Sequence, residues 1–288
     1  MSASVLTIVV KPSLLFLDCV LAGVSRQSSR DFEVLFIADN AQPDAIRYLE
    51  SSIPSLPVPA RVVWSGDALG TDTAERGALR TALRVSTADA IVVSDSVSIL
   101  HPRFMEMHGR HHVRSTIITG PRVELSPEIS SELVKKDILD GWPAGRMTAL
   151  VADGVFGRTT NVSHAFFLPS PRLQSASAAV ARDVHASNFS LCRHDAERLL
   201  RFLDSESAPD ARSLKSKLGM RILSYRNTFV QYRCNEPGSV SLLRVPGVLQ
   251  RVQHLRLSVP ELGLRPAMHS SPRTLQPYRS PRNAVTLP

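Results

Sequence analysis

The sequence has few cysteines and no long uninterrupted apolar run. Its 288 residues include three widely spaced cysteines that form no Cys-x-x-Cys or Cys/His metal pattern, namely Cys19, Cys192 and Cys234. Such a scattered, odd set predicts reduced thiols in a cytoplasmic protein rather than a disulfide framework. No segment reaches the ~18 to 20 uncharged apolar residues that a membrane-spanning helix needs. The apolar N-terminal segment has no positive charge ahead of its apolar run, and Lys11-Pro12 interrupts that run, so we do not expect a signal peptide.

Several motifs of nucleotide and hydrolase chemistry are also missing. The chain has no Gly-x-x-x-x-Gly-Lys-Ser/Thr and no Gly-x-Gly-x-x-Gly after a predicted strand, which argues against P-loop and dinucleotide sites. It has no Gly-x-Ser-x-Gly nucleophile elbow. A histidine group is present, in which His108 and His112 would share one face of a helix, as two metal ligands must. Because no third ligand of suitable type is nearby, we interpret this group, with His101 and His111, as a solvated amphipathic helix.

Positive charge dominates the composition. The formal net charge is +8 and the isoelectric point about 9.9, and arginine far outnumbers lysine. Three interpretations stay open: nucleic acid, which is the least favoured, an anionic membrane face or phosphorylated ligand, or dispersed surface arginines with a basic tail. Arginine suits diphosphates because its guanidinium donates two parallel hydrogen bonds.

Apolar runs alternate with helical patterns in the first third of the chain. The runs are rich in β-branched residues and predict strands at residues 5–10, 32–38, 60–64 and 90–93. Helical patterns lie between them at 14–24, from Pro43 onward, and at 74–83. This alternation predicts an α/β fold with parallel strands and right-handed crossovers. Hydrophobic residues make up 43% of the chain, which is enough for a large core.

The pattern loosens after residue 95. Helices are predicted at 102–113, 126–139, 195–202 and 213–218. Strands are predicted at 115–125 (one or two), at 184–192 and, as a pair, at 221–224 and 228–232. Residues 140–175 are rich in Gly, Pro, Ser and Thr without periodicity, which predicts a long loop. From residue 263 onward Pro, Ser and Arg predict a disordered basic tail.

Two carboxylates follow predicted strands directly. Asp39 ends the second strand and Asp95 the fourth, and ligands of open α/β sheets bind outside these strand ends. Sheet order can place two such tips side by side, where one carboxylate binds a base or ribose and the other orients a cation or sugar hydroxyl. The alternative for Asp39 is a turn cap before Pro43. Asp95 follows a wholly apolar strand, so its carboxylate must reach solvent or a partner.

The order of these motifs resembles that of the family 2 glycosyltransferases, which have the GT-A fold. LTIVV and DFEVLFIADN resemble the family's first two strands, the second of which ends in an acidic residue that contacts the nucleotide base. ADAIVVSDSVSILHPRFMEMH resembles the strand with the Asp-x-Asp signature. ASNFSLCRHDA resembles the Gly-x-Asn-x-Ser segment beside the donor sugar, and LKSKLGMRILSY the helix and strand after the catalytic acidic pair. The resemblance covers residues 5–232 and implies a GT-A-like, Rossmann-type mixed sheet, mainly parallel and flanked by helices.

The resemblance also implies roles for individual residues. Asp39 and Asp95 would contact the nucleotide sugar, Asn188 would lie beside the donor sugar, and Asp95 would ligate Mn²⁺ or Mg²⁺. Candidates for the leaving diphosphate, with solvated surface arginines as the alternative, are Arg76, Arg80 and Arg193.

The departures from the family pattern fall on the chemistry. Val97 replaces the second aspartate of Asp-x-Asp and offers no hard oxygen, so a divalent cation would depend on Asp95 and the donor phosphates alone. The family's Glu-Asp pair, whose aspartate is the general base, should fall at 205–210. Only Glu206 and Asp210 are available there as catalytic residues, and Asp210 is the better candidate. A histidine that the family often has near QYRC is replaced by Gln231 and Tyr232.

Two functions follow from the resemblance, and a third class stays open. The first is an inverting, hexosyltransferase-type glycosyltransferase that moves a sugar from a nucleotide-sugar donor to a saccharide, lipid-linked or small-molecule acceptor. The second is a catalytically inactive pseudo-glycosyltransferase that acts as a binding or scaffold subunit for a partner enzyme. The third is an unrelated nucleotide-binding α/β protein.

The resemblance to the family 2 glycosyltransferases also implies a domain organisation. Residues 1–262 would form one GT-A-like domain, with a nucleotide-binding half to about residue 125, an acceptor-side half at about 126–240 and a C-terminal helix at about 241–262. Residues 241–257 alternate apolar and basic side chains. They could lie on an anionic membrane as a peripheral contact, bind a partner subunit, or pack onto the domain.

Overall fold

The computed structural model describes residues 4–10, 14–38, 41–64, 74–120, 122–180, 187–205, 211–225, 228 and 230–235. The chain divides into two units, Met1–Ser241 and Leu242–Pro288, and every described residue belongs to the first. The predicted C-terminal helix, the contact segment at 241–257 and the basic tail lie outside the described residues.

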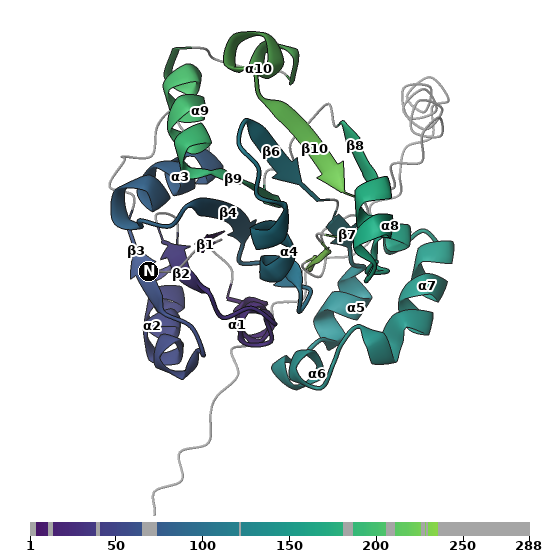
Figure 1. Cartoon of the computed structure of the whole chain (residues 1–288). Coiled ribbons are helices and arrows are strands. Elements are labelled where there is room, and N and C mark those ends of the chain that lie inside the picture. The colour runs from purple at the N-terminus through teal and green to yellow at the C-terminus, as the bar shows by residue number, and fades with distance from the viewer. Residues whose placement is uncertain are drawn as a thin grey trace, which may run out of the picture. The chain divides into compact units, whose positions relative to one another are not determined.

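An eight-stranded mixed sheet forms the centre of the first unit, in the order β3-β2-β1-β4-β9-β6-β10-β8 (Figure 1). Strands β1 to β4 are parallel, as are β6 and β10, whereas β9 is antiparallel to both of its neighbours and β8 is antiparallel to β10. The predicted α/β fold with a mainly parallel sheet is confirmed. The strands are β1 (Ser4–Val9), β2 (Phe32–Ile37), β3 (Ala60–Val63), β4 (Ala90–Asp95), β6 (Thr116–Thr119), β8 (Ala178–Val180), β9 (Phe189–Cys192) and β10 (Arg221–Tyr225).

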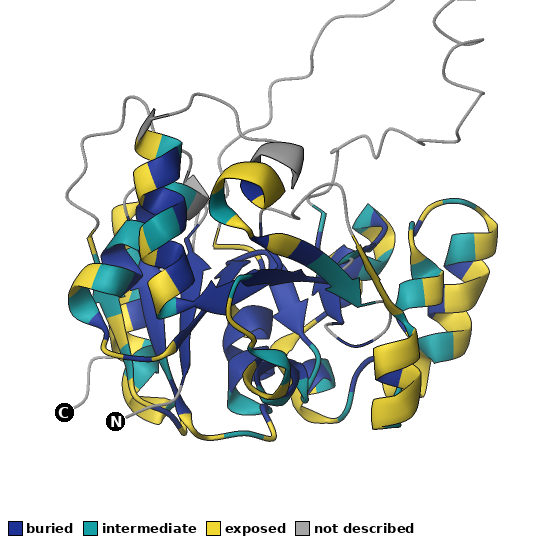
Figure 2. Cartoon of the chain, turned by 45° about the horizontal axis from the view of Figure 1, so that its top comes forward, coloured by how far each residue is buried: buried dark blue, intermediate teal, exposed yellow. Residues whose placement is uncertain are grey.

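Helices cover both faces of this sheet. One face packs on α1 (Leu17–Ser25), α2 (Pro43–Ser52) and α4 (Phe104–His111), and the other on α3 (Ala74–Val85), α9 (Arg193–Ser205) and α10 (Ala211–Leu218). Along β1, Val5 and Val9 face the second layer while Leu6 and Ile8 face the first, because strand side chains alternate between faces. Burial on both faces explains why β1, β2 and β4 are mainly apolar runs. Figure 2 shows the buried strands between helices whose outer surfaces are exposed.

A second, three-stranded sheet follows the central strand β4. It consists of β5 (Ser98–Leu100), β11 (Gln231–Arg233) and β7 (Arg122–Glu124), with β11 in the middle. A third apolar cluster lies against it and includes residues of α5 (Pro127–Glu132), α6 (Lys135–Leu139) and α7 (Met147–Val155). Tyr232 is the largest fully buried side chain of this cluster, and its hydroxyl donates to the Ala165 carbonyl at 2.9 Å.

Three expectations about the second half of the chain are wrong. The predicted strand pair does not form, since β10 belongs to the large sheet and β11 to the small one. The predicted single helix at 126–139 is instead two helices, α5 and α6. Val134 between them has an extended backbone, and its N–H donates to Oδ2 of Asp137 at 3.2 Å, which caps the start of α6. The loop at 140–175 contains α7, α8 (Pro171–Ala176) and two short 3₁₀ turns.

The missed helix α7 has a physical explanation. Helical periodicity is visible only when the outward face is polar, and the exposed positions of α7 are apolar or small. Among the described helices, none combines the length and apolar character needed to cross a membrane.

Candidate functional site

The predicted strand tips meet at one edge of the large sheet, which we call the carboxyl edge. In the register of the parallel strands, Val9 lies beside Ile37 on one side and beside Asp95 on the other. Ala38 continues β2 at this edge, is fully buried, and donates its N–H to the Val63 carbonyl at 3.0 Å. Asp39 itself lies outside the described residues, so its proximity to Asp95 stays a prediction.

The carboxylate of Asp95 is enclosed by its own turn and by one arginine. The side chain is only 2% exposed. Its Oδ1 accepts the Val97 N–H at 3.2 Å, and its Oδ2 lies 3.8 Å from Nη1 of Arg122. The Ser96 N–H donates to the Val9 carbonyl as the last bond of the β1–β4 ladder, and the chain then turns at Ser96 and Val97 into β5. Asp95 therefore has the partner that its place after an apolar strand requires.

Four charged side chains form what we call the carboxyl-edge cluster: Asp95, Arg122, Glu124 and Arg233. Arg122 and Glu124 share one face of β7 because they are two residues apart, and Arg233 is the register partner of Glu124 on β11. Glu124 lies 3.3 Å from Nε of Arg122 and 3.6 Å from Nη1 of Arg233. The side chains of Arg122 and Arg233 are 18% and 38% exposed, so both guanidinium groups are more accessible than Asp95.

The small sheet is fixed to the central strand by a buried hydrogen bond. Gln231 donates from Nε2 to Oγ of Ser94 at 2.9 Å, and both residues are buried. This contact holds β11, and with it Arg233, beside the tip of β4.

Sequence reasoning missed Arg122 and Arg233. Arg122 follows the Gly120-Pro121 bend that was predicted between two strands, and Arg233 directly follows the Gln231-Tyr232 pair that stands in place of the family's histidine. Both arginines thus lie next to recognisable sequence features. Only the pairing of β7 with β11, which the sequence did not indicate, brings the two arginines together.

Asn188 reaches the carboxyl edge, but its side chain is buried. It precedes β9, whose Phe189 pairs with Val93, so its backbone lies one position from the tip of β4. Its carbonyl accepts from the Thr119 hydroxyl at 2.9 Å, and the whole residue is buried. A contact with a donor sugar would require the buried amide to become accessible, so the role of Asn188 stays a prediction.

His108 corrects the expectation of a solvated histidine helix. It is fully buried, with Nδ1 2.7 Å from Oγ of Ser190 and its ring edge-on to Phe104. Burial, with a smaller contribution from His111, lowers its pKa to about 3. Across the part of the chain that is described, no three His, Cys, Asp or Glu side chains are grouped as a metal would need.

The predicted diphosphate arginines separate into two places. Arg76 and Arg80 lie in the first turns of α3, which starts from the carboxyl-edge side because it follows the parallel strand β3. Both pair with Asp204 near the end of α9, and the hydrogen bond from Arg76 is the main reason why the pKa of that carboxyl is lowered. Arg193 lies at the opposite edge, where its guanidinium donates to the Ser86 and Leu83 carbonyls, both at 2.6 Å. It is a helix cap and does not join Asp95.

The predicted catalytic residues Glu206 and Asp210 lie outside the described residues. The flanking helices are described: α9 ends at Ser205 and α10 begins at Ala211. The assignment of a general base to Asp210 or Glu206 stays a prediction.

The groups around Asp95 that are described do not fit a divalent cation. Mg²⁺ and Mn²⁺ prefer several hard oxygen ligands. Here one carboxylate oxygen accepts a backbone N–H, the other faces a guanidinium, and Val97 is buried in the apolar cluster. The guanidinium group of Arg122 lies beside Asp95, where the cation would be expected to bind.

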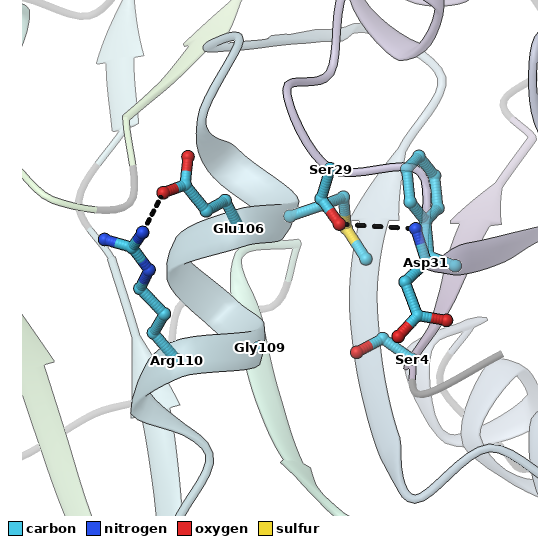
Figure 3. Close-up of a pocket in the computed structure, with 8 residues that line it drawn as sticks. Ser4, Ser29, Asp31, Glu106, Gly109 and Arg110 are labelled. Atoms are coloured by element: carbon cyan, nitrogen blue, oxygen red, sulfur yellow. Dashed lines mark hydrogen bonds and ion pairs between the residues drawn. The ribbon is translucent and has the colours of Figure 1, made fainter.

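A separate pocket of about 290 Å³ lies at the other end of β1, around Ser4 (Figure 3). Its charged lining is already paired, because Arg110 contacts Glu106 at 2.6 Å and Arg103 also binds that carboxylate. These contacts, the one with Arg103 above all, lower the pKa of Glu106 to about 2. The pocket is at the amino edge and contains none of the predicted site residues.

No protein-family model matches the chain, and no curated protein matches it.

Proposed function

We propose that the protein is a glycosyltransferase-like protein of the GT-A type that binds a nucleotide sugar at the carboxyl edge and transfers the sugar with inversion. The observation that carries the proposal is the register of β4 with β1 and β9. It brings the segments that resemble the family's second strand, its Asp-x-Asp strand and its Gly-x-Asn-x-Ser segment to one edge of the sheet.

The carboxyl-edge cluster supports a diphosphate site that needs no metal. Arg122, beside Asp95, and Arg233 present two partly exposed guanidinium groups that share Glu124 and would exchange it for a diphosphate, since guanidinium groups bind phosphate oxygens in pairs. Fixed positive charge stabilises a leaving diphosphate in the same sense as a cation does. Transfer would further require Asp210 or Glu206 to accept the proton of the attacking acceptor hydroxyl.

A non-catalytic nucleotide-sugar-binding subunit is the second candidate. The enclosed state of Asp95 favours it, because a carboxylate that is 2% exposed and bonded to its own turn is poorly placed to meet a donor directly. Such a pseudo-glycosyltransferase would bind the donor and present a surface to a partner enzyme. The acceptor-side half, at about residues 126–240, would then have no catalytic role.

Binding and turnover measured on the same protein separate the two candidates. The full chain is titrated with uridine and guanosine diphosphate sugars in EDTA, and release of the free nucleoside diphosphate is followed by chromatography. Arg122→Gln should weaken binding by about ten-fold or more, since it removes a charged hydrogen-bond donor from the phosphates. Arg47→Gln, on the exposed surface of α2, is the matched control and should bind as wild type does.

Each outcome has a definite meaning. Release of nucleoside diphosphate that Asp210→Asn abolishes supports the transferase, and binding without release supports the pseudo-glycosyltransferase. Equal binding by the Arg122 and Arg47 variants would refute the arginine site. Failure of the wild type to bind any nucleotide sugar would refute both candidates.

A further inference from the structure

Helix α7 has an outward face without a charged side chain. Its exposed residues are Thr148, Ala149, Val151, Ala152 and Val155, and Phe156 follows at its end. The side chains of Val155 and Phe156 are 79% and 72% exposed. Helix α2 is built in the ordinary way, with Asp44, Arg47 and Glu50 exposed. A surface helix with apolar residues outward marks a contact with another apolar body.

The one charged residue of α7, Asp153, lies on the inward side of the helix. Leu150 packs into the third apolar cluster, and Asp153 is buried. Oδ1 of Asp153 lies 2.9 Å from Nε of Arg158, and Oδ2 accepts the Thr159 hydroxyl at 2.5 Å. Arg158 thus neutralises the one acidic group of α7, and residues 141–180, with three arginines and one aspartate, keep a formal net charge of +2.

Arginines flank the apolar face at both ends. Arg146 directly precedes α7, and its only described ion pair is a 3.4 Å contact with the exposed Glu132. Arg158 lies over the ring of Phe156, 5.6 Å from its centroid. Residues 141–180 as a whole contain three arginines, one aspartate and no lysine or glutamate. Apolar side chains with arginines at the rim are the pattern of a helix that lies in the interface of an anionic bilayer.

The charges argue against two other partners for the apolar face of α7, namely residues 241–257 of the same chain and a second copy of α7. Residues 241–257 of the same chain contain Arg244, Arg251 and Arg256 and no acidic residue, so they would bring like charges to the arginine-flanked face. A second copy of α7, packed antiparallel across a two-fold axis, would set Arg146 against Arg158 of its partner. An anionic lipid surface satisfies the apolar face and the arginines together.

We propose that the outer face of α7, with Phe156, docks on an anionic lipid surface. Val151, Val155 and Phe156 enter the boundary between headgroups and acyl chains, while Arg146 and Arg158 stay at the phosphates. This contact is separate from the carboxyl edge and independent of any nucleotide-sugar binding.

Vesicle sedimentation of the full chain tests the proposal. Vesicles of phosphatidylcholine with phosphatidylglycerol should pellet the wild type, and vesicles of phosphatidylcholine alone should pellet much less. The double variant Val155→Asp/Phe156→Asp should lower the bound fraction at anionic vesicles about ten-fold or more, because it removes apolar area and adds two negative charges. The matched control is Val113→Asp. The Val113 side chain is 52% exposed and lies outside α7, so this variant should bind as wild type does.

Three results would overturn the proposal. The first is absence of wild-type binding to the anionic vesicles. The second is undiminished binding by the double variant, which would place the contact in another part of the chain such as 241–257. The third is a wild-type dimer that the double variant dissociates in gel filtration without any change in vesicle binding, which would assign the face to a second copy. Since all three substituted side chains are exposed, unchanged thermal unfolding is the check that the variants are folded.

Discussion

Mild acid should destabilise the folded protein through His108. The side chain is fully buried, and burial lowers its pKa from 6.5 to about 3. The unfolded chain therefore takes up a proton below pH 6.5 that the folded chain does not accept until about pH 3. Stability from this group is complete above the unfolded pKa and is lost as the pH falls below it.

The size of the effect follows from the two pKa values. One pH unit below the unfolded pKa, at about pH 5.5, the loss from one such histidine is about 1.4 kcal/mol of unfolding free energy. His101 has the same sign, since burial and then the charges of Arg26 and Arg103 lower its pKa to about 4. The pKa of Glu106, about 2, keeps its contribution below this pH window.

Urea unfolding at about pH 7.5 and about pH 5.5 measures this loss. The variant His108→Gln should lose about 1.4 kcal/mol less between the two pH values than the wild type does, whatever its own stability, because one titrating group is gone. The control is Tyr232→Phe, which is buried and does not titrate in this range, and which should keep the wild-type loss. An identical pH dependence of the wild type and the His108 variant would refute the buried, neutral histidine.

Three further predictions concern packing and ion pairs. Gly154→Ala should lower the melting temperature, because the added Cβ would lie 2.4 Å from Cγ2 of Val162. Adding Val162→Ala to this variant should restore part of the lost stability. The control is Gly77→Ala, where the added Cβ has open space, and it should raise the free energy of unfolding by up to about 1 kcal/mol. Tyr232→Phe should cost about 1 kcal/mol in denaturant unfolding, because it removes the hydrogen bond to a buried carbonyl. Asp204→Asn should change stability by less than about 1 kcal/mol, since its ion pairs are half-exposed. It should strengthen nucleotide-sugar binding in calorimetry, because it removes a negative charge beside the two arginines of α3, and weaker binding would contradict this.

The first half of the fold could be predicted because its sequence patterns are unambiguous. Strands β1, β2 and β4 are buried on both faces, so each is an apolar run, and α2 has a polar outer face. The tip of β4 was therefore identified correctly as a carboxylate at the carboxyl edge. The place of Asn188 at the same edge also follows from the strand pairing, but not the burial of its amide.

The second half could not be predicted in the same way, because its patterns depend on tertiary partners. β11 is a strand of three residues whose neighbours, β5 and β7, are more than a hundred residues earlier in the chain. No local pattern identifies such a partner, so β11 was paired with β10 instead. Arg122 and Arg233 were missed for the same reason, since only that pairing brings Arg233 to Glu124 and Arg122.

The central claim is that the carboxyl edge binds a nucleotide sugar, and calorimetric titration of Asp39→Ala beside the wild type tests it most directly. In EDTA, the wild type should bind a uridine or guanosine diphosphate sugar and Asp39→Ala should not, while Asp44→Asn, an exposed carboxylate on α2, should bind as the wild type does. Equal binding by the wild type and Asp39→Ala, or no binding by the wild type, would contradict the claim.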